Sequence, residues 1–467
     1  MTTAITPLPP GPSLARVLWL SLRPLRDHSS FLSECHRRYG DPFSFPGLQG
    51  PVVTTCDTEA IKGIFAADPD TFASPMSEAF GPFLGENSVL LVSGKRHRAA
   101  RRLLMPPFNG ARMRAYGTIM RDAARAWGER WQPGQTLSVQ ETTLAISLEV
   151  IIRAVFGVQS DEGAQRLHQA TTQLMAAVSP LIVGFPALRR DFGGLGPWAR
   201  YQRLRRDFEA LLRAEIEAKR AQAAGAQAQD ILSLLVQARY EDGQPLSERE
   251  ILDQLISMVV AGHETVAVAL AWAVYALHRN PATLTRLRAE LDAVDATAEG
   301  PDPDALAALP YLDAVCQETL RRYPLAPLVQ RKLARPYTLQ GRGPALPLPA
   351  GTLIGASLLV HFDPAIYPDP QRFDPDRFLS RSYAPSEFLA FGGGARRCLG
   401  AAFATQELRI VLGTLLRHHQ LRLLPTPSDR DLHLVVRAAT IGPESGVRMV
   451  YEGPRSSTAA RAARERR

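Results

Sequence analysis

The segment FGGGARRCLG, residues 391–400, combines a cysteine with glycines and arginines in a way that suits metal-ligand chemistry. Cys398 falls just before an expected helix at 401–418, where free backbone N–H groups and the helix dipole stabilise a thiolate. Arg396 and Arg397 add positive charge, and the glycines permit close approaches that other residues forbid. The loop therefore predicts a thiolate suited to a soft metal centre; the plainer alternative is a small buried hydrophobe.

The cysteine positions indicate that such a centre must bring most of its own ligands. Cys35, Cys56, Cys316 and Cys398 are far apart and form no C-x-x-C pair, which argues against a disulfide scaffold and a structural zinc site. No second Cys or His stands near Cys398 in the sequence to complete a tetrahedral protein-only site. A cofactor that carries four ligands needs only one more. The same cysteine usage predicts a reducing, cytoplasmic compartment.

A long apolar helix is expected between a capping-box pattern at Ser247 and Glu250 and a stop at Pro281. From 255 to 277 it is apolar almost all round, so it either spans a membrane or forms the centre of a large core. A carboxylate near its middle, Glu264, would cost at least ~2.5 kcal/mol in lipid. It is also the one candidate span in the sequence, so we expect it in the protein interior.

The middle of this helix reads GHET, and two of its residues could handle protons. Glu264 and Thr265 place an acid beside an alcohol, which could hold a water molecule and relay protons. The Thr265 hydroxyl could also bond back to the carbonyl one turn earlier and open a groove. Gly262 could let a flat group approach the backbone. Alternatively, Gly262 only permits close helix packing and Glu264 reaches a partner or water.

A second helix, YLDAVCQETLRRYP, carries a carboxylate and a guanidinium three residues apart. Glu318 and Arg321 share one helix face. Such a pair is usually a weak surface feature. Arg377, in the coil RFDPDRF at 372–378, could complete a buried network with Glu318.

The elements that must position these residues predict a mainly α fold with small β-sheets. The chain has 467 residues, 45% hydrophobic and 21% charged, and a formal net charge of +8, which is ordinary for a soluble globular protein. Helical spacing dominates 96–330, a small sheet is expected at 331–362, and 363–400 is a long coil rich in proline and glycine. A second β region ends at Tyr451. We expect one domain over 1–467.

The two ends and one internal stretch predict exposed, irregular chain. Residues 1–13 form a proline-rich, extended leader, and the apolar run after it is too short for a span, which needs roughly 20 residues. The tail at 453–467 carries five arginines and one glutamate and is expected to be disordered. Its charge would permit nucleic-acid binding, but no nucleic-acid motif is present, so none is predicted. AQAAGAQAQ at 221–229 is expected to link two helices.

Four motifs together resemble the cytochrome P-450 family. FGGGARRCLG is similar to its haem-binding loop, Phe-x-x-Gly-x-x-x-Cys-x-Gly. AGHET at 261–265 resembles the oxygen-activating segment of the family's central helix. ETLR at 318–321 resembles its Glu-x-x-Arg motif, with Arg377 as third member. GKRHRAARRLLMPPF at 94–108 resembles the helix that clamps the haem propionates. The motifs follow the family order over 94–403, and the chain resembles a soluble bacterial member.

This resemblance implies a fold, a cofactor and roles for residues. The fold would be a triangular helical domain with haem b between the central helix and the cysteine-loop helix. Thr265 and Glu264 would deliver protons to dioxygen, although Val266 stands where many members have a second Thr or Ser. Glu318, Arg321 and Arg377 would support the loop. Cys398 would be the axial iron ligand. The other haem-contacting positions would be His97, Arg101, Arg331, Arg396, Phe391, Gly392, Gly394 and Gly400.

The implied activity is insertion of one oxygen atom from dioxygen into a lipophilic small molecule, such as a fatty acid, terpene or polyketide. The implied form is a cytoplasmic monomer without a membrane span. Since no flavin- or iron–sulfur-binding segment is evident in the sequence, electrons would come from a separate ferredoxin or flavodoxin and its NAD(P)H reductase. Pocket positions are expected at Phe83, Val259, Ala261, Ala326, Leu328 and Val329.

A basic face would suit an acidic redox partner, and the expected residues are Arg98, Arg102, Arg322 and Arg397. Two alternatives remain open at this point. A peroxygenase would take oxygen from hydrogen peroxide, but such members resemble one another in lacking the acid–alcohol pair. A haem-thiolate sensor would need no proton relay at all.

Overall fold

The structure is a computed structural model, and its helices and sheets match the expected mainly α class. It describes residues 8–21, 30–47, 49–108, 110–158, 160–222, 230–294, 296–297, 300–425, 432, 434–437, 440–444 and 446–455.

Helices make up most of the described chain. The α-helices are α1 Leu14–Ser21, α2 Ser30–Tyr39, α3 Thr58–Ala66, α4 Ser77–Leu84, α5 Gly94–Leu104, α6 Ala111–Gly128, α7 Val139–Phe156, α8 Asp161–Ala177, α9 Pro180–Gly184, α10 Gly196–Gln222, α11 Ile231–Gln237, α12 Glu248–Arg279, α13 Pro281–Asp292, α14 Pro303–Ala307, α15 Pro310–Arg322, α16 Asp376–Ser380 and α17 Ala401–His418. Short 3-10 turns are η1 Pro69–Thr71, η2 Pro106–Phe108, η3 Pro186–Leu188, η4 Leu358–Phe362 and η5 Gly394–Arg396.

The strands form small sheets, and the largest has the order β1-β2-β10-β7-β3. In it β10 runs parallel to β2, while the other pairs are antiparallel. The smaller sheets are β11-β14-β4, β12-β13, β5-β6 and β8-β9. The strands are β1 Phe43–Gly47, β2 Gly50–Thr55, β3 Phe72–Ala73, β4 Thr136–Ser138, β5 Ala296–Thr297, β6 Gly300–Pro301, β7 Leu328–Leu333, β8 Tyr337–Leu339, β9 Leu346–Leu348, β10 Leu353–Ser357, β11 His419–Leu423, β12 Leu434–Arg437, β13 Thr440–Pro443 and β14 Arg448–Pro454.

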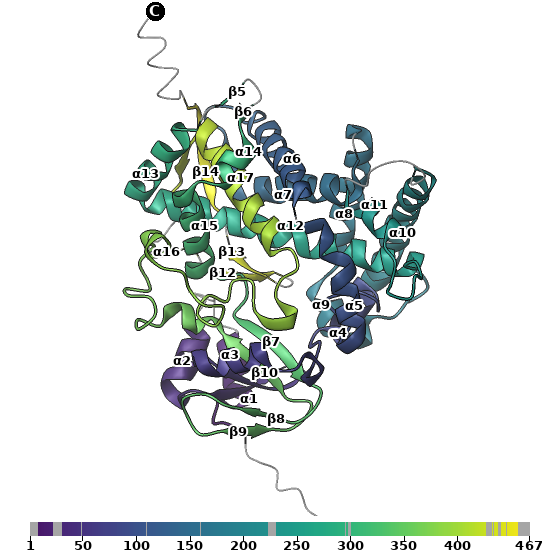
Figure 1. Ribbon diagram of the computed structural model, residues 1–467, viewed down its shortest axis with the longest axis vertical. Coiled ribbons are helices and arrows are strands. Elements are labelled where there is room, and N and C mark those ends of the chain that lie inside the picture. Colours follow the sequence, from purple (N-terminus) through teal and green to yellow (C-terminus); the bar gives the residue numbers. More distant parts are fainter. Residues whose placement is uncertain are drawn as a thin grey trace, which may run out of the picture.

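The molecule narrows from a wide helical part to the corner that holds the five-stranded sheet with α2 and α3 (Figure 1). Helix α12 runs through the helical part and packs against α7, α15 and α17. In the described part of the chain it is the one helix long and apolar enough to cross a membrane, and 72% of its most apolar window is buried inside the protein. The expectation of an interior helix is therefore confirmed.

The start of α12 forms as the sequence predicts. The Glu250 backbone N–H donates to the Ser247 hydroxyl over 3.2 Å, and the Ser247 N–H donates to the Glu250 carboxylate over 2.8 Å. These two bonds satisfy groups that a helix start otherwise leaves unpaired.

Some predicted boundaries differ from the structure. The apolar run after β10 turns into η4 instead of extending the strand, and Arg377 lies in α16 instead of coil. Residues 453–455 are part of the fold, because β14 extends to Pro454 and Arg455 pairs with Asp292 at 2.9 Å. Residues 1–7, 223–229 and 456–467 of the predicted leader, linker and tail lie outside the described residues.

Helix α17 buries a carboxyl group that the motifs do not explain. Glu407 is fully buried, and the Ser147 hydroxyl faces its carboxyl group. Burial raises the pKa of Glu407 from 4.5 to about 8, despite the nearby Ser147 hydroxyl. Glu407 is therefore protonated at neutral pH in the folded chain.

Glu407 should make folding stability depend on pH. Between the unfolded and folded pKa values only the unfolded state loses this proton, so stability falls as pH rises from about 4.5 to about 8. We expect Glu407→Gln to remove this pH-dependent loss of folding stability, which in total is on the order of several kcal/mol. Urea unfolding of both proteins at several pH values measures it. A difference between them that stays constant over this range would contradict the prediction.

Candidate functional site

The loop before α17 needs its glycines for two different reasons. Gly392 and Gly394 have φ values of 62° and 64°, which favour glycine. A Cβ atom on Gly393 would lie 2.2 Å from Cδ2 of Phe65, and one on Gly394 would lie 2.3 Å from the Phe65 carbonyl oxygen. The loop thus lies directly against α3. The Cys398 N–H closes it by donating to the Phe391 carbonyl over 2.9 Å.

The Cys398 side chain is solvent-exposed. Neighbouring protein atoms nevertheless lie close enough to its sulfur to change the pKa of the thiol. Desolvation raises the pKa of this thiol, while the Gly400 N–H, Arg397 and Arg101 act in the opposite direction. The helix start and an arginine thus act in the direction that the sequence predicts, and desolvation by the surrounding fold opposes them. A bound metal would displace the proton directly.

Cationic side chains gather beside the loop around a buried histidine. His97 on α5 is buried, and its pKa is lowered to about 4 by burial and by Arg396, Arg101, Arg331 and Arg98. The imidazole is therefore neutral at pH 7, because burial and four nearby guanidinium groups oppose its protonation.

Two of these arginines, Arg331 and Arg396, have surroundings that disfavour their charged form. Burial and Arg396 lower the pKa of Arg331 to about 10, and burial and Arg101 lower the pKa of Arg396 to about 10. With His97 they line a small pocket, and its lining includes no acidic side chain in the described chain. Such a set of buried cations suits a ligand that carries negative charge.

The same arginines donate to neutral acceptors, which leave their charge uncompensated. In the described residues no carboxylate pairs with Arg101, Arg331 or Arg396. The acceptors are the Arg397 carbonyl for Arg101 at 2.7 Å, the Gly393 carbonyl for Arg331 at 3.1 Å, and the Val92 carbonyl and Ser93 hydroxyl for Arg396 at 2.6 and 2.9 Å.

The middle of α12 is the one part of its apolar stretch that the fold leaves accessible. Residues 260–262 and 264–265 are partly or fully exposed, with Ala261 exposed, while the turns on either side are buried. An alanine open to solvent in the middle of a core helix marks a place that no protein side chain fills. Cys398 in the loop is likewise exposed.

The acid–alcohol pair has defined partners. The Thr265 hydroxyl donates to the Ala261 carbonyl over 2.9 Å, the back-bond expected from the sequence. Glu264 accepts a hydrogen bond from the Thr440 hydroxyl of β13 at 3.1 Å. The role of Thr440 as a partner of Glu264 was not predicted, since 175 residues of chain separate a short strand from this helix.

Gly262 serves helix packing. A Cβ atom there would lie 2.7 Å from Cδ1 of Ile151 on α7. A side chain at 262 would have to displace the end of Ile151, which supports the alternative that glycine permits close helix packing here.

Glu318, Arg321 and Arg377 form the predicted network inside the protein. Arg321 Nε and Nη2 donate to the two carboxyl oxygens of Glu318 over 2.6 and 2.8 Å, and both side chains are fully buried. Arg377 adds a contact to Glu318 at 3.3 Å. The geometry is the bidentate form that gives the strongest charge-assisted hydrogen bonds.

His361 connects this network to the cysteine loop and was not predicted. Its carbonyl accepts from Arg321 over 2.7 Å, and its Nε2 accepts from the Leu389 N–H over 2.8 Å. Burial and Arg321 lower the pKa of His361 to about 3, so the ring is neutral and its Nδ1–H can donate to the Arg321 carbonyl at 3.2 Å. The network thereby holds the chain two residues before Phe391.

The predicted pocket residues of α4 and α12 have different surroundings. Phe83 is buried, with ring centroids 5.9 Å from Trp198 and 5.0 Å from Tyr201. Val259 is also buried, and Ala261 is exposed. Ala261 is thus the one of these three that is open to an incoming molecule without rearrangement.

The remaining predicted pocket residues lie on or before β7. Ala326, Leu328 and Val329 are partly exposed. Leu328 packs on the hydrophobic cluster around Phe43, whereas Val329 lies against the loop, 3.3 Å from where a Gly392 Cβ would be. Leu328 and Val329 are neighbours on β7 and point to opposite sides of it, Leu328 toward the sheet corner and Val329 toward the loop.

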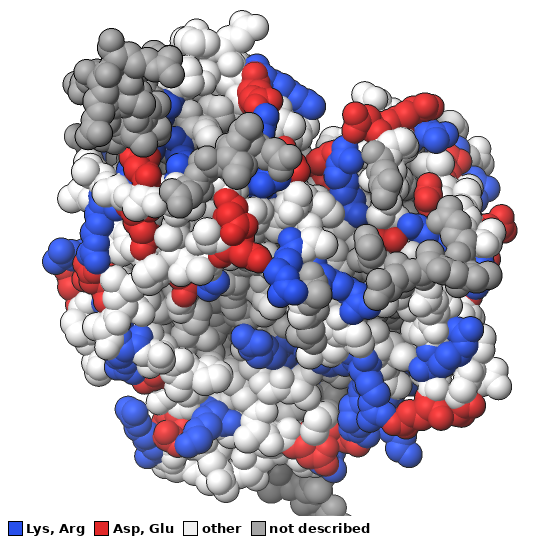
Figure 2. All heavy atoms as spheres, turned by 45° about the horizontal axis from the view of Figure 1, so that its top comes forward, with Lys and Arg blue, Asp and Glu red and all other residues white. Residues whose placement is uncertain are grey.

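The proposed basic face is less cationic than the sequence suggests. Arg98 pairs with Asp70 at 2.9 Å, Arg102 pairs with Glu241, and Arg322 donates to the Gln371 carbonyl over 3.0 Å. Arg397 is exposed. Basic and acidic side chains are also interspersed over the face drawn in Figure 2.

Comparisons with known proteins agree on one family. The family model described as Cytochrome P450 matches residues 7–440. Putative cytochrome P450 135B1 of Mycobacterium tuberculosis is 38% identical over 430 residues, covering 91% of this chain and 87% of the relative. Putative cytochrome P450 135A1 of the same species is 34% identical, covering 96% of both. The solved structure of retinoic acid bound cyanobacterial CYP120A1 superposes with a TM-score of 0.78 at 26% identity, covering 96% of this chain and 99% of that one.

Proposed function

The chain belongs to the cytochrome P450 family and is a haem-dependent monooxygenase, and we propose that it hydroxylates or epoxidises a lipophilic small molecule with electrons from separate redox partners. The proposal is supported by the cation cluster beside the cysteine loop, by the exposed Cys398 in that loop and by the accessible middle of α12. When bound, haem supplies the iron at which dioxygen is activated, and a thiolate ligand favours O–O cleavage.

We assign the cofactor as haem b and its holding residues as follows. Cys398 would ligate the iron through sulfur, and the Gly400 N–H next to that sulfur would temper its charge. His97, Arg101, Arg331 and Arg396 would bind the two propionates, since these side chains have no acidic partner in the described chain and would gain charge-assisted hydrogen bonds. Phe391, Gly392 and Gly394 would shape the loop around the sulfur.

Thr265 and Glu264 are assigned to proton delivery. The Thr265 hydroxyl lies on the accessible turn of α12 and can turn from the Ala261 carbonyl to a substrate-side water. Glu264, held by Thr440, can exchange protons with solvent from its partly exposed position. Together they would move protons from solvent to the reacting oxygen, the work of a general acid.

Replacing Thr265 by alanine tests this assignment. We expect product formed per NAD(P)H to fall by at least ~10-fold while NAD(P)H oxidation continues, because proton delivery and not electron supply is lost. Turnover with surrogate redox partners measures both rates. Thr265→Ser, which keeps the hydroxyl, is the matched control and should retain coupling.

The outcomes of this test separate the alternatives. Unchanged coupling in Thr265→Ala would contradict the proton-relay role. Absence of product in both the wild type and the variant would favour a sensor. Full turnover with hydrogen peroxide and none with dioxygen and NAD(P)H would contradict the monooxygenase assignment and indicate a peroxygenase.

The substrate is proposed to be lipophilic, from the aliphatic character of the accessible positions. Ala261, Ala326 and Val329 offer apolar surface without fixed charge. Arg189 does not provide a carboxylate anchor as it stands, since its guanidinium donates to the carbonyls of Ile182, Val183 and Ala79. The CYP120A1 structure holds retinoic acid, a lipophilic molecule, which agrees with this class. Fatty acids, terpenes and polyketides all fit it.

Electrons are proposed to come from a ferredoxin or flavodoxin and an NAD(P)H reductase. The exposed Arg397 next to Cys398 is the best-placed residue for an acidic partner. Arg98 and Arg102 would first have to exchange their present carboxylate partners for those of the redox protein. The four free cysteines fit a reducing cytoplasm, where we expect the enzyme to act as a monomer.

A further inference from the structure

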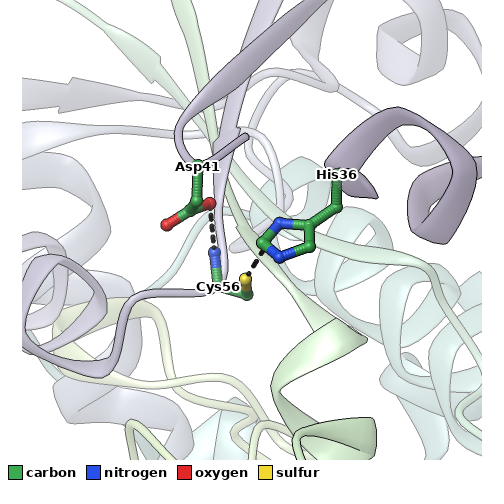
Figure 3. A group of neighbouring side chains, drawn as sticks. All are labelled: His36, Asp41 and Cys56. Atoms are coloured by element: carbon green, nitrogen blue, oxygen red, sulfur yellow. Dashed lines mark hydrogen bonds between the residues drawn. The ribbon is translucent and has the colours of Figure 1, made fainter. Parts of the chain in front are cut away.

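Three side chains of metal-ligand type meet in the corner of the molecule that holds the large sheet. His36 lies on α2, Asp41 in the turn before β1, and Cys56 directly after β2 (Figure 3). Their ligand atoms all lie within 4.8 Å of one another. None of the three belongs to the proposed haem site.

The distance between two of these atoms matches that of a tetrahedral zinc site. Cys56 Sγ and His36 Nδ1 are 3.5 Å apart. Zinc binds sulfur at about 2.3 Å and imidazole nitrogen at about 2.0–2.1 Å, and at the tetrahedral angle such ligands are about 3.5 Å apart. A metal ion could therefore enter between them with little movement of either side chain.

The carboxylate of Asp41 is already oriented by its neighbours. Its Oδ1 accepts from the Cys56 N–H over 2.9 Å, and its Oδ2 accepts from the Thr55 hydroxyl over 2.7 Å and from the Asp57 N–H over 3.2 Å. These bonds use three of about four acceptor positions of a carboxylate. The Cys56 thiol also hydrogen-bonds this carboxylate, and loss of its proton on metal binding would leave a position for the cation. Fixed outer partners of this kind orient ligands and raise metal affinity.

The local charge also favours a dication. The Asp41 and Asp363 carboxylates both act on the Cys56 side chain. A metal ion would compensate these negative charges. Zinc binding would exchange the thiol proton, which goes to solvent, for a Zn–S bond.

We propose that His36, Asp41 and Cys56 form a zinc site, with a water molecule as the fourth ligand. The site would join α2 to the end of β2 and stabilise the sheet corner. It escapes notice in the sequence because the three residues are spread over 21 positions without a C-x-x-C or H-x-x-H pattern. The register of β1 on β2, in which Phe43 opposes Thr54, brings Asp41 next to Cys56.

Zinc content measured on the haem-loaded protein tests this site independently of turnover. The protein is stripped with EDTA, dialysed against buffered Zn²⁺ and analysed by mass spectrometry. We expect one zinc per chain in the wild type and in Cys35→Ala, a matched control one residue before His36. We expect at least ~10-fold weaker retention in Cys56→Ser and His36→Gln. Equal retention in the wild type and both variants would overturn the proposal.

X-ray absorption at the zinc edge of the wild type needs no variant. One sulfur at about 2.3 Å with nitrogen and oxygen ligands at about 2.0–2.2 Å would support the site. A shell of oxygen and nitrogen alone would show surface-bound zinc and overturn the proposal. Zinc should also raise the melting temperature of the wild type and of Cys35→Ala but not of Cys56→Ser.

Discussion

Cys398→Ser is expected to abolish monooxygenase activity while leaving a folded chain. Serine keeps the size of the side chain but removes the sulfur that we assign as the iron ligand, and with it the electron donation that favours O–O cleavage. The reduced protein with carbon monoxide should lose the red-shifted Soret absorption that reports thiolate ligation. Absorption spectra and product analysis measure both effects, and circular dichroism checks the fold.

The chain supplies its own control for this experiment. Cys316 is a buried, free cysteine on α15, and Cys316→Ala should keep both the red-shifted band and the activity. If Cys398→Ser kept the band, another cysteine would have to ligate the iron, and the assignment of the loop would be wrong.

Arg321→Ala is expected to destabilise the fold by about 3–5 kcal/mol. The change leaves the Glu318 carboxylate buried without its bidentate partner and leaves the carbonyls of His361 and Pro370 without their donor. The Arg372 carbonyl keeps only its longer bond from Arg377. Because His361 holds the chain at Leu389, haem retention should fall as well. Urea unfolding and the haem-to-protein ratio measure the two effects.

An exposed ion pair provides the matched comparison. Arg381 pairs with Glu387 at 2.9 Å, and its side chain is 46% exposed, so Arg381→Ala should cost less than about 1 kcal/mol. The double variant Arg321→Met with Glu318→Leu should recover part of the loss, since no uncompensated charge remains. A loss below about 1 kcal/mol in Arg321→Ala would contradict a stabilising role for the network.

Local sequence signals predicted the parts of the fold that local physics controls. The capping box at Ser247 fixed the start of α12, and its apolar surface indicated an interior helix. The back-bond of Thr265 to Ala261 also followed from the ordinary behaviour of a hydroxyl in a helix. Each of these features depends on residues within one or two helical turns.

Features that depend on distant contacts were not predictable. Phe65 explains why Gly393 and Gly394 tolerate no side chain, Thr440 is a partner of Glu264, and His361 links Arg321 to the loop. None of these pairs has a sequence pattern, because the partners come from elements that meet only after folding. The desolvation of the Cys398 thiol was not predictable for the same reason, because the helix start is local whereas the desolvation comes from the whole fold.

The way Arg321 reaches its partners has a consequence for divergence among related chains. Apart from Glu318, its acceptors are main-chain oxygens contributed by 361, 370 and 372, and Arg377 likewise contacts the carbonyls at 368 and 369. A peptide oxygen is present whatever the side chain, so the coil positions 368–370 and 372 can change identity over evolution without loss of this anchoring, whereas His361 is also needed for its ring. In related chains, the backbone conformation of this coil should therefore be conserved better than its amino-acid sequence.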